Sequence, residues 1–412
     1  MNTSTSVSSP ITTTETDIQS FLAAHAAAHD FSLALWRLPN NSASHLILSR
    51  HSALIKKDAT IEELPTGFIF SPFDRQKDTL FLKADLSFSF DDGQLKTPVT
   101  PLENSSATWL SEQRIHASPD EAGHQRRRAS PTGPFMFRKM TAPLQEPTQA
   151  TFTTLVHQAV AQIEAGTAEK IVPSRFKQVP LPEGFDLIDM FQRLCKAYPN
   201  ALVSLVHTPG HGTWIGATPE MLVSVEDGTT FKTVALAGTR PYDPSVSLRE
   251  VMWNQKEIEE QALVERYIIS CFKKIRVREY DERGPKTSVA GNLMHLRSDF
   301  TVDLKAINFP QLGSVMLQLL HPTSAVCGMP LEPALEFLRA HEGYDREFYS
   351  GYLGPINFHR DINLFVNLRC MQLFENTAVL YAGAGVTIDS VAEQEWHETE
   401  IKLNTMLSVL KP

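Results

Sequence analysis

Hydrophobic positions recur along the chain with two spacings, one typical of helices and one typical of strands. A period near 3.6 residues predicts a helix over 15–29, another over 152–165, and a long one that runs to about residue 275. Ser247 and Glu250 have the spacing of a capping box ahead of that long helix, which is expected to start near Asn254. Short apolar or alternating runs predict strands over 31–38, 45–48, 67–70, 80–90, 170–172, 201–207, 212–217, 221–225, 231–236, 288–296, 363–372 and 378–382.

The order of these elements predicts the fold class. Strands follow one another in hairpin-like succession, with helices between the groups. This order favours an α+β fold in which mainly antiparallel sheets pack together and helices lie outside. We expect one compact domain with a disordered tail over 1–14, a variable part over 15–149 and a denser core over 150–412. Residues 91–147 are rich in proline, serine and charge, which predicts a mobile segment.

Charge and composition exclude several classes of function. The chain carries 38 Lys and Arg against 47 Asp and Glu, a net charge of −9. Without a basic stripe, nucleic-acid binding is not expected. No run of 18 apolar residues occurs, so no membrane span is expected, and residues 1–14 lack the features of a signal peptide. The four cysteines have no CxxC pairing, which indicates free thiols in a reducing cytoplasm.

The C-terminal segment carries a candidate metal and anion site. A glycine-rich turn over 381–386 precedes a predicted helix that carries Glu395, Glu398 and Lys402. Their i, i+3 and i+7 spacing places all three on one face of that helix. Carboxylates held in this way are suitable ligands for Mg2+, and the lysine can hold an anion.

A second pair of glutamates, Glu257 and Glu260, lies one turn apart on the long predicted helix. Alone, such a pair is more often a solvated helix face. Two glutamate pairs on two helices, however, can clamp one Mg2+ from both sides.

Two polar residues within apolar strand patterns are candidates for acid–base chemistry. Lys170 begins an apolar strand, where it can extend to solvent or, if buried near positive charge, serve as a general base. Glu220 follows Pro219 at a strand junction, where it can be an exposed turn residue or an acid that protonates a leaving hydroxyl. For either residue alone, the structural explanation is the more common one.

Further residues have candidate anion-binding roles. Gly238 and Thr239 end a strand in a small-residue turn, whose N–H groups can cradle a carboxylate or simply form a tight turn. Arg369 lies within a predicted strand and needs a carboxylate partner, either a substrate or a structural salt bridge. His295 is more simply explained as a core histidine, and Tyr349 as a packed aromatic or a hydroxyl donor.

Together these segments resemble the chorismate-utilising enzymes, a family of isochorismate, salicylate, anthranilate and aminodeoxychorismate synthases. The matching segments are KIVPSR at 170–175, GATPEML at 216–222, ALAGTR at 235–240, KEIEEQALV at 256–264, NLMHL at 292–296, LHPTSAVCG at 320–328, YDREFYSGYLG at 344–354, YAGAGV at 381–386 and EWHETEIKLNTML at 395–407. Their order and spacing are specific, and within the family they are most similar to isochorismate synthases.

The resemblance implies a chorismate-binding-enzyme fold with 150–412 as its catalytic core, and chorismate as the substrate. It implies that Lys170 activates a water for attack on C2 and that Glu220 protonates the departing C4 hydroxyl, which yields isochorismate. It also implies Mg2+ on the ring carboxylate, with Glu260 and Glu398 as main ligands and Glu257 and Glu395 in support. The remaining implied substrate contacts are Gly238 and Thr239 to the ring carboxylate, His295 along the ring, and Tyr349, Arg369, Gly383 and Lys402 to the enolpyruvyl carboxylate.

Three alternative functions follow from the same resemblance. A salicylate synthase shares almost every site residue and goes on to eliminate pyruvate, but Tyr344-Asp-Arg346 is more similar to isochorismate synthases. Ammonia-using relatives need a glutaminase partner and lack a lysine at the position of Lys170. A silent chorismate-binding module is disfavoured by the complete set of candidate catalytic residues. The resemblance implies that a cytoplasmic monomer suffices, with no obligatory protein partner, and that the product feeds menaquinone or siderophore synthesis.

Overall fold

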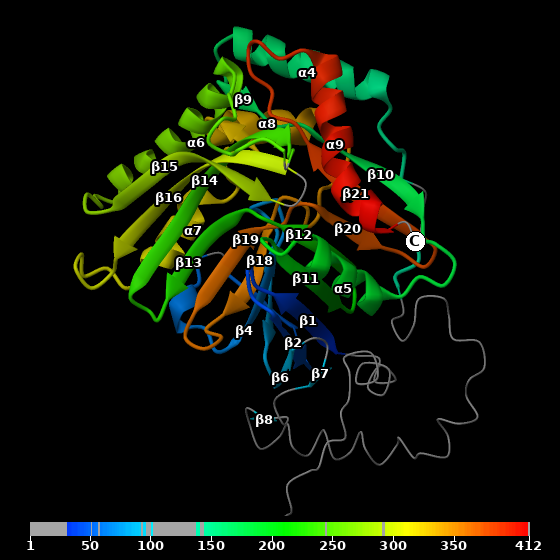
Figure 1. Ribbon diagram of the computed structural model, residues 1–412, viewed down its shortest axis with the longest axis vertical. Helices are drawn as coiled ribbons and strands as arrows, with labels where there is room; N and C mark the ends of the chain where they lie inside the picture. Colours follow the sequence, from blue (N-terminus) through cyan, green and yellow to red (C-terminus); the bar gives the residue numbers. More distant parts are fainter. Residues whose placement is uncertain are drawn as a thin grey trace, which may run out of the picture.

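Two large antiparallel sheets lie at the centre of the molecule, and helices cover their outer faces (Figure 1). The computed structural model describes residues 31–50, 52–56, 58–91, 94–95, 100–101, 137–140, 144–243, 245–290 and 293–410. Every strand pair in the two sheets is antiparallel, so the predicted α+β class is confirmed. The predicted helix over 15–29 lies outside the described residues. No helix in the described part of the chain is both long and apolar enough to cross a membrane.

The first sheet has ten strands and the second has nine. In spatial order the first contains β10 (Ser174–Pro180), β21 (Thr377–Gly383), β20 (Cys370–Leu373), β12 (Gly212–Thr218), β11 (Leu202–Thr208), β1 (Ser32–Arg37), β2 (Ala43–Ser49), β6 (Leu86–Asp91) and β7 (Gln94–Leu95), with β8 (Thr100–Pro101) also on β6. The second contains β15 (Asp281–Ala290), β16 (Leu293–Asp303), β14 (Thr230–Pro241), β13 (Met221–Glu226), β19 (Ile362–Val366), β18 (Tyr352–Ile356), β4 (Gly67–Ser71), β5 (Thr79–Lys83) and β3 (Ser52–Ile55). A separate ribbon pairs β9 (Lys170–Ile171) with β17 (Gly328–Met329).

The helices form the outer layer. They are α4 (Gln149–Glu164), α5 (Leu187–Ala197), α6 (Gln255–Lys274), α7 (Leu312–Leu320), α8 (Leu331–His341) and α9 (Ala392–Leu410), with a 3-10 turn η1 at Ile61–Glu63. Helices α5 and α9 pack on the first sheet, α6 and α7 pack on the second, and α4 lies against α9 (Figure 1). Large buried side chains fill the space between the sheets, among them Trp36, Phe68, Trp214 and Phe365. Removal of this apolar surface from water stabilises the packing of one sheet on the other.

Three predicted strands are wrong in the same way, because each is really two strands. The 80–90 segment is β5 in the second sheet and β6 in the first, and 363–372 is β19 in the second and β20 in the first. The 288–296 segment spans the end of β15 and the start of β16, which form a hairpin. Hydrophobic periodicity misses the first two breaks because the flanking residues stay largely buried where the chain passes from one sheet to the other.

The long helix starts near Asn254, as predicted, and not at the capping-box spacing of Ser247 and Glu250. Helix α6 begins after Asn254, whose side chain accepts the N–H of Glu257 while the Glu257 carboxylate accepts the N–H of Asn254. This is a capping box with the same spacing as Ser247 and Glu250, which instead form a turn in the preceding exposed loop. Two adjacent segments therefore satisfy the same sequence signature, and the one next to the amphipathic run caps the helix.

The predicted mobile segment over 91–147 lies mostly outside the described residues. Where it is described, the chain pairs with or packs on the core: β7 and β8 both pair with β6, and Phe137 is buried. Near its end, Glu146 accepts the backbone N–H of Gln178 on β10. These described parts belong to the folded body.

Candidate active site

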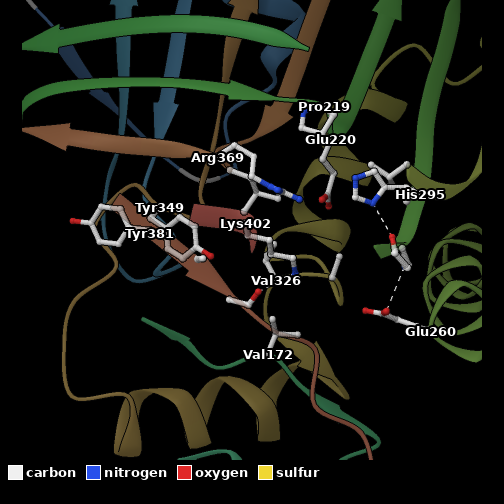
Figure 2. Close-up of a pocket in the computed structure, with 17 residues that line it drawn as sticks. Val172, Pro219, Glu220, Glu260, His295, Val326, Tyr349, Arg369, Tyr381 and Lys402 are labelled. Atoms are coloured by element: carbon white, nitrogen blue, oxygen red, sulfur yellow. Dashed lines mark hydrogen bonds between the residues drawn. The ribbon is translucent and has the colours of Figure 1, made fainter. Parts of the chain in front are cut away.

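A pocket lies where the chain passes between the two sheets (Figure 2). It brings together Glu220, Gly238, Glu260, His295, Tyr349, Arg369, Gly383 and Lys402, all of which the sequence had singled out. Glu220 lies in the connection from β12 to β13, and Arg369 in the connection from β19 to β20. Because a connection between sheets leaves the strand ladders, its side chains can point into the space between them.

Arg369 differs from its prediction as a strand residue. It adopts a left-handed backbone conformation with φ of +48° between β19 and β20. Its guanidinium donates to Thr405 of α9 at 3.2 Å. Figure 2 shows the Arg369 guanidinium and the Glu220 carboxylate directed toward the same part of the pocket, beside His295.

Glu220 has the electrostatics of a proton donor. Burial raises the pKa of Glu220 to about 7, although the positive charges of Lys170, Lys402 and Arg369 each lower it. A carboxyl with such a pKa is partly protonated at neutral pH, which a general acid requires. The expected turn glutamate is therefore a buried, perturbed carboxyl at a strand junction.

His295 is neutral in this pocket. Burial, reinforced by the charge of Arg369, lowers the pKa of His295 to about 3. Its Nδ1 lies 2.7 Å from the carbonyl oxygen of Gly238. Since a carbonyl only accepts, Nδ1 carries the ring proton and Nε2 is left as an acceptor.

The opposite wall supplies groups that can hold an anion. Lys402 Nζ donates to the Gly383 carbonyl at 2.9 Å and pairs with Glu398 at 2.7 Å. The Tyr349 hydroxyl lies beside Gly383, and burial raises the pKa of Tyr349 to about 12, so the phenol stays protonated and can donate. Lys402, Tyr349 and Arg369 thus present donors to one region of the pocket.

The turn at Gly238 and Thr239 is a bulge in β14. The pairing of β14 with β16 shifts register between Ala237 and Arg240, and Gly238 has φ of +66°. The Gly238 N–H points to Glu260 at 3.3 Å. A bulge of this kind exposes backbone N–H groups that a strand would use for pairing, which suits a carboxylate.

Lys170 is buried beside the pocket, with 1% of its side chain exposed. Its ammonium donates to Glu260 at 2.8 Å, and Glu260 lines the pocket while Lys170 does not. A Cβ on Gly385 would lie 2.9 Å from both Glu260 Oε1 and Lys170 Cε, so glycine permits this ion pair to pack against the 381–386 turn. That turn does not lead directly into α9, which begins at Ala392.

The four glutamates predicted to bind Mg2+ form what we call the carboxylate cluster: Glu257 and Glu260 on α6, and Glu395 and Glu398 on α9. Each is paired with its own basic side chain. The pairs are Glu257 with Arg240 at 2.7 Å, Glu260 with Lys170 at 2.8 Å, Glu395 with Lys256 at 2.6 Å, and Glu398 with Lys402 at 2.7 Å. No group of three or more His, Cys, Asp or Glu within the described ranges stands close enough to hold a metal ion in this arrangement.

The chemistry of the carboxylate cluster nevertheless fits a hard divalent cation. All of its potential ligand atoms are carboxylate oxygens, the donors that Mg2+ prefers. Glu395 is fully buried, and its Oε2 has no hydrogen-bond partner among the described residues. A buried carboxylate oxygen without a partner is costly, so the site has an unused ligand atom. Glu257 is the least available of the four, because both of its oxygens bind Arg240.

Sequence reasoning missed the contact that fixes α9. The side chain of Arg175 on β10 is 1% exposed, and its Nε donates to Thr399 at 2.7 Å. The same guanidinium forms an ion pair with Glu400 and lies 3.6 Å from the ring centroid of Trp396. The three partners have i, i+3 and i+4 spacing and share a helix face adjacent to that of Glu395, Glu398 and Lys402. That spacing was readable from the sequence, but its partner on a distant strand was not. The sequence also did not predict the apolar side chains that line the pocket, which include Val172, Leu236, Ala325, Val326 and Leu368.

A buried acid–base pocket bounded by cations, set between two antiparallel sheets, defines a protein suited to bind and transform a small anion. The chain belongs to the chorismate binding enzyme family: the profile described as "Chorismate binding enzyme" matches residues 95–411. The resemblance seen in the sequence is thereby confirmed.

Known relatives and structures agree with this assignment. Over 268 residues the chain is 30% identical to the isochorismate synthase EntC of Escherichia coli K12, covering 64% of this chain and 68% of EntC. It is 32% identical over 267 residues to DhbC of Bacillus subtilis strain 168, an isochorismate synthase, covering 62% and 66% of the two chains. The structure of MenF, the menaquinone-specific isochorismate synthase from Escherichia coli, superposes with a TM-score of 0.73 over 98% of this chain and 93% of MenF at 20% identity, which supports the fold.

Proposed function

We propose that this protein is an isochorismate synthase, an isomerase that converts chorismate to isochorismate. The observation that carries the proposal is Glu220, a half-buried carboxyl with a pKa of about 7 that shares one pocket with Arg369 and Lys402. The identity of 30–32% to relatives named isochorismate synthase supports it. The MenF structure is that of a menaquinone-specific enzyme, and for this chain we propose menaquinone synthesis, or alternatively siderophore synthesis, as the use of the product.

Substrate binding follows from the charges of the pocket. Chorismate carries two carboxylates. Arg369, Lys402 and Tyr349 present donors to one of them, the enolpyruvyl carboxylate. The bulge at Gly238 and Thr239 presents backbone N–H groups to the other, on the ring. The apolar side chains between these two ends exclude water from the ring.

The proton transfers divide between two residues. The Lys170 amine takes a proton from a water as that water forms a bond to C2. Glu220 gives its proton to the C4 hydroxyl, whose bond to carbon breaks and which leaves as water while the ring double bonds shift. One water enters and one leaves, so the substrate changes only in the position of its hydroxyl. His295 is not a second acid, because its proton lies on Nδ1, directed at the Gly238 carbonyl.

Mg2+ fits this site as a cofactor. When bound, it would supply positive charge to the ring carboxylate, with Glu260 and Glu398 as its holders and Glu257 and Glu395 behind them. Glu260 can hold Mg2+ only if it moves away from the Lys170 ammonium. This movement would also separate Lys170, the proposed base, from its ion-pair partner.

The test is the product formed from chorismate by the purified protein with Mg2+ and without ammonia, resolved by liquid chromatography with mass detection. Isochorismate at unchanged mass, without pyruvate, is expected. Salicylate with pyruvate would make the protein a salicylate synthase. No conversion until ammonia or a glutaminase is added would overturn both the proposed reaction and its independence from a protein partner.

A further inference from the structure

We propose that Lys256 is a built-in counter-cation of the carboxylate cluster, which it neutralises when no metal is present and from which a divalent cation must displace it. The inference rests on the metal site of the proposed function, and it assigns a role to a residue that the proposed reaction does not use. Lys256 would thereby set how tightly the site takes up metal.

The position of Lys256 is that of a bridge between the two helices of the cluster. It lies in the first turn of α6, one turn before Glu260, and its ammonium donates to Glu395 of α9 at 2.6 Å. Glu395 is fully buried, and Lys256 donates a hydrogen bond to its Oε1. The other oxygen, Oε2, has no partner among the described residues. The ammonium therefore holds the buried charge of Glu395 on one side only.

More than one carboxylate acts on this ammonium. The Lys256 ammonium contacts Glu395 and lies one helical turn before Glu260, and Glu398 follows Glu395 by one turn on α9, so the charges of all three carboxylates act on it. These are three of the four proposed metal-site residues. The Lys256 ammonium and a divalent cation would therefore be attracted by the same negative charges.

The other three cations of the cluster are less able to leave. Lys170 is 1% exposed, and Lys402 is 19% exposed and also donates to the Gly383 carbonyl. Arg240 holds Glu257 with two hydrogen bonds and donates a third to the Met252 carbonyl. Lys256 is 36% exposed, and Glu395 is its single hydrogen-bond acceptor within the described chain. A flexible lysine stem at the protein surface can swing into water without leaving a second buried group unpaired.

Removal of the ammonium should therefore have two opposite effects. The cluster becomes one unit more negative, so it attracts a divalent cation more strongly; with water-like screening (an effective dielectric of about 80 at a separation of about 6 Å) we expect about tenfold tighter binding. Without metal, the buried Glu395 loses its counter-charge, so the metal-free protein becomes less stable. A lysine that merely packed against the helix would show the second effect without the first.

The experiment measures thermal unfolding as a function of MgCl2 concentration, without substrate and at constant ionic strength, since a ligand that binds only the folded state stabilises it by RT ln(1 + [L]/Kd) and so raises Tm. We compare the wild type with Lys256→Met and Lys256→Gln; the glutamine keeps a hydrogen-bond donor for Glu395 and removes the charge. Lys273→Met is the matched control, because Lys273 is an exposed lysine near the other end of the same helix.

We expect both Lys256 variants to begin at a lower Tm than the wild type and to reach the same Mg2+-induced increase in Tm at about one tenth of the wild-type concentration. Lys273→Met should follow the wild-type curve. If both variants need the wild-type Mg2+ concentration or more for that increase, the role of Lys256 is overturned while the metal site stays intact. If Lys256→Met does not fold, Lys256→Gln decides the question alone. No Mg2+ response in the wild type would overturn the metal site itself and this inference with it.

Discussion

Two half-buried glutamates of this pocket, Glu220 and Glu260, have opposite electrostatic environments. Both are penalised by burial, and both feel the charge of Lys170. Glu260 contacts the Lys170 ammonium directly, and that ion pair, with Lys402 and Lys256, lowers the pKa of Glu260 well below its usual value despite burial. Glu220 has no ion pair within the described ranges, so burial dominates and its pKa rises to about 7.

The difference shows that direct contact, more than the number of nearby charges, decides the protonation state of a buried carboxyl. The connection between β12 and β13 holds Glu220 away from its cations, which leaves it a proton to give. Helix α6 places Glu260 against the Lys170 ammonium, which keeps this carboxylate ionised. One pocket thus contains an acid and an anion made from the same residue type.

The largest effect should come from removal of the acid. Glu220→Gln keeps the shape of the side chain but cannot give up a proton, so we expect turnover to fall by about 10²- to 10⁴-fold while chorismate still binds. Steady-state kinetics and equilibrium binding check this. Glu226→Gln is a suitable control, because Glu226 lies at the end of β13 in an ion pair with Lys232 outside the pocket. Turnover within tenfold of the wild type would remove Glu220 from the proton transfer.

A smaller effect is expected from Arg369, which binds and does not transfer protons. Arg369→Gln removes the charge that faces the enolpyruvyl carboxylate, so KM should rise by about 10- to 100-fold with a smaller change in kcat. Arg369→Lys should recover part of the binding, since it restores the charge without the planar donor pair. If kcat falls and KM stays constant, Arg369 acts in the chemical step and its assignment to binding is wrong.

The raised pKa of Glu220 also predicts a pH-dependent stability. Between the ordinary pKa of 4.5 and the folded-state value of about 7, the folded protein holds a proton that the unfolded chain releases. The stabilisation by that proton is complete below pH 4.5 and is lost as the pH rises through 7. Glu220→Gln should therefore be more stable than the wild type by about 1 to 3 kcal/mol at pH 8, and by much less at pH 5. Urea unfolding at both values measures this; equal differences at the two would indicate an ordinary pKa.

The smallest effect should come from the outermost pair of the carboxylate cluster. Arg240 is 32% exposed, so its ion pair with Glu257 is partly screened by water, and Arg240→Gln should cost about 1 kcal/mol or less. Because both oxygens of Glu257 are directed at Arg240, we expect the Mg2+ dependence of Tm to change little. A large change in that dependence would show that Glu257 is a closer partner of the metal than this arrangement indicates.

The sequence predicted the fold class and most strands because burial and periodicity are local properties. It also selected the pocket residues, since the spacing of Glu395, Glu398 and Lys402 on one helix is fixed by helix geometry. It could not predict the breaks at Asp85 and Arg369, where the chain changes sheets without leaving the interior. Hydrophobic periodicity reflects the burial of side chains, and the pattern of buried side chains does not change at these two breaks.

The sequence also could not predict ion pairs between residues that are far apart along the chain. The bond from Lys256 to Glu395 joins residues 139 positions apart, and Arg175 reaches Glu400 across 225 positions. Each of these residues alone has the appearance of an ordinary surface or strand charge. Only the packing of α6 and α9 on the sheets brings them together, so the electrostatic contrast between Glu220 and Glu260 is a property of the fold.

The most direct test of the proposed chemistry is the source of the hydroxyl at C2. The protein is incubated with chorismate and Mg2+ in water enriched in ¹⁸O, and the isochorismate formed early in the reaction is analysed by mass spectrometry. The account predicts that each product molecule carries one ¹⁸O at C2, since water adds there and the C4 hydroxyl leaves. Product without the label would contradict the account, because the hydroxyl would then have moved within the substrate and Lys170 would have no water to activate.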